Sequence, residues 1–142
     1  MNDQSGRRNP RHTTYFDELA TALRAHANGL YCLQASVELL IGHQRWLCRD
    51  DFVGRFVRLI PGLAGGGALA VVSWRAAVRA LAAGRLPCSD SEEHVLRIAA
   101  GIADGVPVDL RECLSILDET NVGLVVDAVR HANGRWLAGE MR

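Results

Sequence analysis

The sequence predicts an all-α protein, a compact single domain built as a bundle of about seven short helices. Three observations predict this fold class. Apolar residues recur every three or four positions along most of the chain, Ser, Thr or Asp precedes many of these runs, and Gly or Pro follows them. The chain has 142 residues, 49% hydrophobic and 23% charged, which suffices for one domain with a real core.

The first two helices are expected in the first third of the chain. Thr14 and Asp17 form a pattern like a capping box, so we expect the first helix to begin at Thr14. Gly29 ends it, because glycine readily adopts the left-handed conformation that closes helices. A second helix is expected at about 30–41, with Gly42 ending it.

The third helix begins at Asp50 and carries an apolar stripe as far as Ile60, where Pro61 stops it. The segment that follows is rich in glycine and predicts a flexible loop. Residues 68–72, "ALAVV", form a candidate short extended segment.

Four more helices are expected in the second half, each with a start signal. Ser73 precedes one, and Ser89 with Glu92 forms a Ser-x-x-Glu capping box for the next. Asp109 caps a short helix, and Asp118 caps the last one. The last helix carries four valines that we expect to face the core, namely Val122, Val125, Val126 and Val129.

The domain is expected to span 13–134, between an arm at 1–12 and a tail at 135–142. Two interpretations of the arm stay open: an unpacked terminus, or a segment that enters a DNA minor groove. The second interpretation depends on the three basic residues of the arm, Arg7, Arg8 and Arg11.

Sixteen arginines, with no lysine, balance sixteen acidic residues, so no overall field attracts nucleic acid or an anionic membrane. The longest uncharged run, at 59–74, contains Pro61 and four glycines and is too short to cross a bilayer. The polar N-terminus lacks the apolar segment of a signal peptide. We therefore expect a cytoplasmic protein with no membrane contact, whose four cysteines are reduced.

The last helix also gathers polar residues that could suggest a site. Asp118 and His131 stand thirteen residues apart in the sequence, about 20 Å along a helix, and cannot pair within it. Asp127 and His131 share the face opposite the valines, and we interpret them as an exposed ion pair rather than a catalytic dyad. Leu124 lies near that polar face, so this helix is either covered on two sides or contacts a partner.

No arrangement in the sequence predicts a catalytic residue, a cofactor or a metal. The four cysteines are widely spaced, without a local pair of the kind that anchors zinc. His43 and Cys48, in "HQRWLC", form the nearest approach to a ligand pair and are kept as a weak alternative. The glycine run lacks the Gly-Lys-Ser/Thr ending of a phosphate loop.

Two features bear on partners. Trp136 is a candidate contact residue because exposed tryptophan often anchors interfaces, although the tail could instead fold back onto the domain. A helix-turn-helix is disfavoured, because acidic residues begin both candidate recognition helices, at Asp50 and Asp118, where phosphates would approach.

Two stretches, "VELLIGHQRWLCRDDFVGRFV" and the segment from "WRAAVRALAAG" to "VVDAVRHANG", resemble small uncharacterised helical proteins of high-GC actinobacteria. The resemblance covers most of 30–134. It implies a bacterial cytoplasmic protein of compact helical form, and it carries over no activity, ligand or catalytic residue.

Our leading hypothesis is a non-catalytic helical protein that acts through protein contacts or self-association, as in a homodimer, with Leu124 and Trp136 as contact residues. One alternative is a DNA-associated regulator that uses the arginine-rich arm, although the balanced charge makes nucleic acid a less favoured partner. Another is a small metal-binding or enzymatic protein centred on His43 and Cys48.

Overall fold

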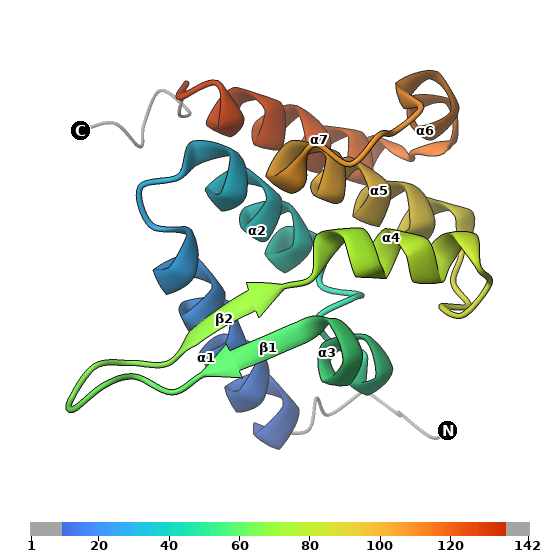
Figure 1. Ribbon diagram of the computed structural model, residues 1–142. Coiled ribbons are helices and arrows are strands. Elements are labelled where there is room, and N and C mark those ends of the chain that lie inside the picture. The colour runs from blue at the N-terminus through green and yellow to red at the C-terminus, as the bar shows by residue number, and fades with distance from the viewer. Residues whose placement is uncertain (1–9, 136–142) are drawn as a thin grey trace, which may run out of the picture.

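The computed structural model describes residues 10–135, with side chains from residue 14 onward (Figure 1). These residues form seven helices: α1 (Pro10–Ala27), α2 (Tyr31–His43), α3 (Asp50–Phe56), α4 (Trp74–Ala82), α5 (Asp90–Asp104), α6 (Leu110–Ile116) and α7 (Glu119–Ala132). They also form two strands, β1 (Val57–Ile60) and β2 (Leu69–Val72). None of the described helices has the length and apolar character that crossing a bilayer requires.

The small sheet corrects the all-α expectation. The third helix was expected to reach Ile60, but α3 ends at Phe56 and the next four residues are strand β1. β1 pairs antiparallel with β2, with Val57 opposite Val72. Val, Leu and Ile suit strands as well as helices, and the glycine-rich loop at 61–68 lets the chain turn back to form this pairing. The extended segment expected near 68–72 is confirmed as β2, which lies against α1.

Two predicted helix boundaries are also wrong. α1 begins four residues before Thr14, which therefore lies within the helix and does not cap it. Gly42 lies inside α2 rather than after it. Helix α2 ends at His43, and the next residue, Gln44, has a φ of 69°. The end of α1 before Gly29, at a φ of +84°, is confirmed.

The other start signals lie where the sequence placed them. Ser89 and Glu92 form the predicted capping box at α5, with the Glu92 N–H 3.2 Å from the Ser89 hydroxyl. Asp109 and Asp118 each accept a hydrogen bond from the backbone N–H three residues on, at the starts of α6 and α7. Ser73 precedes α4, but its side chain makes no capping hydrogen bond.

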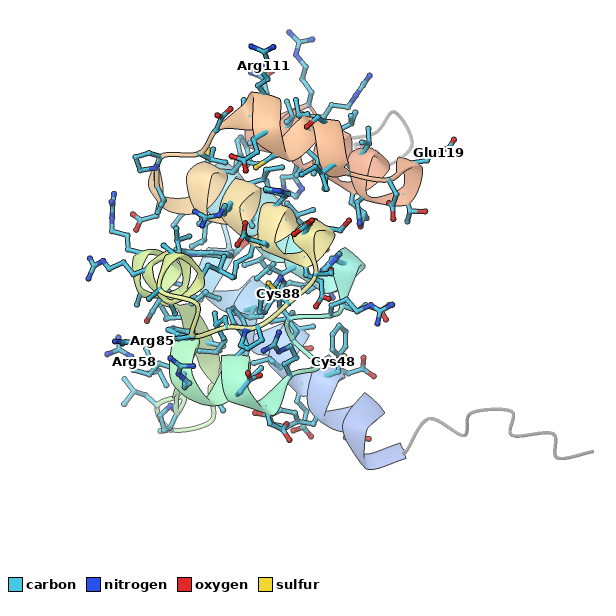
Figure 2. The ribbon with its side chains drawn as sticks, turned by 90° about the vertical axis from the view of Figure 1, so that its right-hand side faces the viewer. Cys48, Arg58, Arg85, Cys88, Arg111 and Glu119 are labelled. Atoms are coloured by element: carbon cyan, nitrogen blue, oxygen red, sulfur yellow. The ribbon has the colours of Figure 1, made fainter. Side chains whose placement is uncertain are left out.

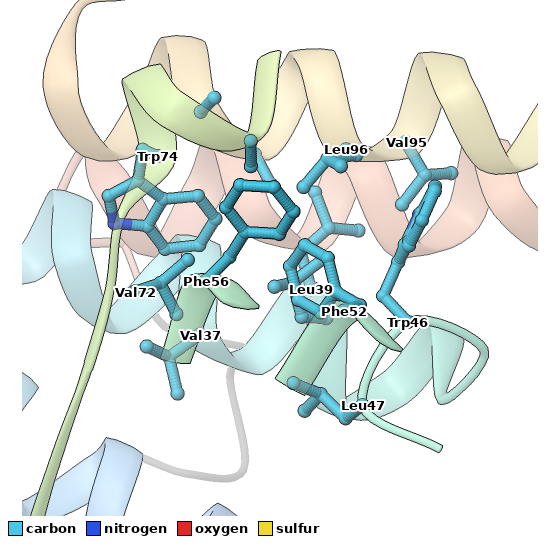
Figure 3. Packing of buried hydrophobic residues seen from close by; sticks show 14 of the residues in the cluster. Val37, Leu39, Trp46, Leu47, Phe52, Phe56, Val72, Trp74, Val95 and Leu96 are labelled. Carbon is cyan, nitrogen blue, oxygen red and sulfur yellow. The ribbon is translucent and has the colours of Figure 1, made fainter. Parts of the chain in front are cut away.

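The core surrounds α2, which packs against α1, α5 and α7. A row of tilted aromatic rings joins Trp46, Phe52 and Phe56, with ring centroids 5.2 Å and 5.7 Å apart (Figure 3). The Trp46 indole N–H donates to the carbonyl oxygen of Glu92 at 2.9 Å, which ties the turn after α2 to the start of α5. Trp74 is also buried, so two of the three tryptophans are core residues.

Candidate functional site

The face of α7 that packs on the protein is not the one that the sequence predicts. Of the four valines only Val125 is buried, while Val122, Val126 and Val129 are 36%, 46% and 57% exposed. Helix α7 instead turns Leu124 and Ala128 toward α2 and the core. The expectation of an inward valine stripe is therefore wrong.

The reason lies on α2. Gly42 has no side chain at the point where Leu124 approaches, and a Cβ atom there would lie 2.9 Å from Leu124 Cδ2. This glycine and the short Ala128 side chain let the two helices pack closely on that side of α7. Hydrophobic periodicity ranks faces by apolarity alone and cannot detect a complementary surface on another helix.

The packed side of α7 also carries polar residues, and one of them forms a hydrogen bond with α2. His131 Nε2 lies 3.1 Å from Oε1 of Gln34 on α2, which is a hydrogen bond between side chains 97 positions apart. Asn121, in the first turn of α7, is buried. Part of the face that we interpreted as an exposed surface is therefore an intramolecular contact.

The valine face, defined as Val122, Val126 and Val129, is a single stripe because its members are four and three residues apart. Gly123 borders it, with open space where a side chain would be. Helix α6 lies beside the start of α7 (Figure 1) and exposes three more large apolar residues, Leu110, Leu114 and Ile116. Apolar side chains that follow one face of a helix, as the three valines do, are typical of interaction surfaces, whereas single exposed residues are ordinary.

A polar cleft lies on the other side of α7, between α1, α2 and α7, with a volume of about 550 Å³. A bidentate ion pair joins Arg24 to Glu38 on its wall, with N–O distances of 2.6 Å and 3.1 Å. Asp127, Arg130 and His131 also line it. Charges of both signs above an apolar floor can hold a small polar molecule. Among the residues at 14–135, no cysteine or hydroxyl nucleophile lines the cleft.

His43 and Cys48 do not form a metal centre in the described residues. His43 is half-buried with its Nδ1 atom unbonded, and burial lowers its pKa, although the Glu92 and Asp118 carboxylates act in the opposite direction. Cys48 is exposed. Across the part of the chain that the structure describes, no three His, Cys, Asp or Glu side chains gather as a metal ion would require.

Sequence reasoning missed one histidine–cysteine contact. His94 on α5 and Cys113 on α6 are both buried, and Cys113 Sγ lies 3.2 Å from His94 Nδ1. Burial raises the pKa of the Cys113 thiol, which favours the protonated form and suppresses nucleophilicity. The contact is therefore a hydrogen bond within the core. No sequence signal links two residues on separate helices in this way.

Of the residues predicted from the sequence to contact a partner, the structure describes the side chain of Leu124 alone. Leu124 is half-buried, packed against α2 and at the edge of the cleft. Trp136, Arg7, Arg8 and the side chain of Arg11 lie outside the described residues. No family model matches the chain, and comparisons with curated proteins and with solved structures found no match.

Proposed function

We propose that this protein acts through protein contacts, and that its basic unit is a homodimer in which the valine face of α7 meets the same face of a second copy. The observation that carries the proposal is the exposure of Val122, Val126 and Val129 on a helix whose other side packs against α2. Homodimers usually pair one patch with itself across a two-fold axis. Each copy carries one valine face, so two copies together provide both sides of such an interface.

The charges beside the valine face suit an antiparallel pairing. Glu119 at the start of α7 and Arg130 near its end are both exposed, and helical geometry places them at the same edge of the stripe. When two α7 helices cross antiparallel near Val126, Glu119 of each copy faces Arg130 of the other. In a parallel two-fold pair these edges lie on opposite flanks of the interface, so neither charge meets its opposite in the partner.

The expected affinity is modest. Each half-exposed valine contributes on the order of 1 kcal/mol when the partner covers it, and association costs several kcal/mol of lost freedom. The six valines of two copies together give about 6 kcal/mol, less than the about 8 kcal/mol that a micromolar dissociation constant requires, so we expect a dissociation constant weaker than micromolar. The cytoplasmic location remains part of this proposal, supported by four free cysteines in the described residues.

Size-exclusion chromatography with light scattering tests the proposal directly. Val126→Asp places a charge at the centre of the stripe and is expected to give a monomer at every concentration, whereas the apparent mass of the unmodified protein rises toward that of a dimer as its concentration is raised. The matched control is Leu63→Asp, because Leu63 is 92% exposed in the hairpin loop, away from α7. A monomeric unmodified protein, or a dimer that Val126→Asp leaves intact, overturns the proposal.

A further inference from the structure

The chain is neutral overall, but its charges are segregated. Residues 44–88 hold seven arginines and two aspartates, whereas residues 89–135 hold four arginines and nine acidic residues. The first stretch forms α3, the β-hairpin and α4, and the second forms α5, α6 and α7. A balanced total therefore conceals a basic side and an acidic side.

Two arginines of the basic stretch are neutralised by neighbours. Arg49 pairs with Asp51 at 2.6 Å, and Arg75 pairs with Asp104 at 3.2 Å. The other five are exposed and make no ion pair with any carboxylate that the structure describes. Arg45 lies in the turn after α2, and we refer to the remaining four as the arginine edge: Arg55, Arg58, Arg79 and Arg85.

A hydrogen bond brings two of these arginines together from separate elements. Arg55 on α3 donates from Nη1 to the carbonyl oxygen of Arg85 at 3.1 Å, and its guanidinium lies 4.9 Å from the ring centroid of Phe56. The backbone N–H of Arg85 in turn donates to Ala80 on α4 at 2.9 Å. Figure 2 shows Arg58 and Arg85 at the same edge of the molecule. The fold thus holds Arg55 beside Arg85, and Arg79 lies one residue before the Ala80 carbonyl that accepts from Arg85.

We infer that the arginine edge binds the phosphate backbone of duplex nucleic acid. Guanidinium groups donate several hydrogen bonds in a plane that matches phosphate oxygens, and several unpaired cations suit a polyanion better than a single anion. The edge continues into the antiparallel hairpin of β1 and β2, whose loop at 61–68 is exposed throughout (Figure 1). A two-stranded ribbon fits the major groove of a duplex, and an acidic protein surface or a lipid headgroup layer offers no such groove.

This inference is independent of the proposed dimer, because the edge belongs to α3, β1, α4 and the loop after α4, whereas the valine face belongs to α7. Four phosphate contacts predict that the logarithm of the association constant falls with the logarithm of salt concentration with a slope of about −3 to −4. We expect little sequence preference, because phosphate contacts position a protein without reading bases.

Fluorescence anisotropy with a labelled random-sequence duplex, at salt concentrations from about 50 mM to about 200 mM, tests the inference. The double variant Arg58→Glu/Arg79→Glu is expected to bind at least about tenfold more weakly at the lowest salt, with a slope smaller by about 2. The control is Arg111→Glu, which makes one of the same Arg-to-Glu reversals, half the charge change of the double variant, at an exposed position of α6 on the acidic side (Figure 2). Circular dichroism verifies that each variant is folded.

Three outcomes overturn the inference. One is no anisotropy change for the unmodified protein at the lowest salt. Another is equal weakening by the edge variant and by Arg111→Glu. The third is duplex binding that is unchanged in Arg58→Glu/Arg79→Glu but is lost when Arg7, Arg8 and Arg11 are replaced by glutamine. That result assigns the binding to the N-terminal arm. Capture of the protein by anionic vesicles or by a second copy, without duplex binding, counts against it equally.

Discussion

Leu124 of α7 lies directly over Gly42 of α2, so that a Cβ atom at Gly42 would be 2.9 Å from Leu124 Cδ2. This contact fixes which side of α7 faces the core, and it leaves the valine face exposed. Gly42→Val is expected to lower the free energy of unfolding by up to about 1 kcal/mol more than Gly123→Val, because the added side chain displaces the Leu124 side chain.

Comparing Gly42→Val with Gly123→Val separates the effect of the contact with Leu124 from the effect of replacing a glycine within a helix. Gly123 lies in α7 with nothing within 4 Å of its Cβ position, so both variants make the same change inside a helix. Urea unfolding followed by circular dichroism gives the two free energies. Equal destabilisation by the two variants contradicts the close approach.

A charge exchange tests the antiparallel pairing of α7 helices. Arg130→Glu is expected to weaken the dimer several-fold at low salt, since it places two carboxylates opposite each other at both ends of the interface. The double variant Glu119→Arg/Arg130→Glu restores opposite charges and is expected to recover most of the loss. Sedimentation velocity measures both dissociation constants. A double variant that associates more weakly than the single one argues against this orientation.

The thiols are expected to react with Ellman's reagent in the order of their exposure. Cys32 and Cys48 are exposed and should react fast, whereas Cys113 is buried against His94 with a raised pKa and should react only on unfolding. Cys113→Ala should therefore leave the fast phase unchanged and remove one thiol from the total measured in guanidinium chloride. A fast phase that shrinks in Cys113→Ala contradicts the buried contact.

Stability is expected to fall with acidification through His43. Burial lowers the pKa of this side chain, so between the folded pKa and the usual histidine value of about 6.5 the unfolded chain binds more protons than the folded one. The free energy of unfolding therefore decreases as the pH falls from about 7.5 to about 5.5, and His43→Gln should show a smaller decrease. If the free energy of unfolding depends on pH identically in the unmodified protein and in His43→Gln, His43 is not the cause of the decrease.

Much of the fold could be predicted because its signals are local. The Ser89–Glu92 box and the Asp109 and Asp118 caps act within one turn of helix, and the structure has each at the predicted place. Residues 57–60 were assigned to a helix because Val, Leu and Ile carry an apolar stripe equally well in either conformation. Their pairing with β2 depends on a contact across a loop, which helical periodicity does not encode.

The candidate site could be predicted only in part. The sequence identified α7 as the helix with two apolar sides, but it assigned the valines to the core and Leu124 to the second side. The actual assignment depends on Gly42, a residue 82 positions earlier, which the sequence suggested was a helix terminator. The arginine edge was missed for a related reason, since the total charge is zero and the segregation emerges when the elements are assembled.

The most direct test of the dimer is sedimentation equilibrium at low and high salt, for the unmodified protein and for Val126→Asp. Apolar burial is not screened by ions, so we expect a dimer that persists at high salt and a variant that is monomeric at both salt concentrations. A protein that is monomeric at every concentration would contradict a dimer formed through the valine face. So would a dimer that dissociates at high salt and is unaffected by Val126→Asp.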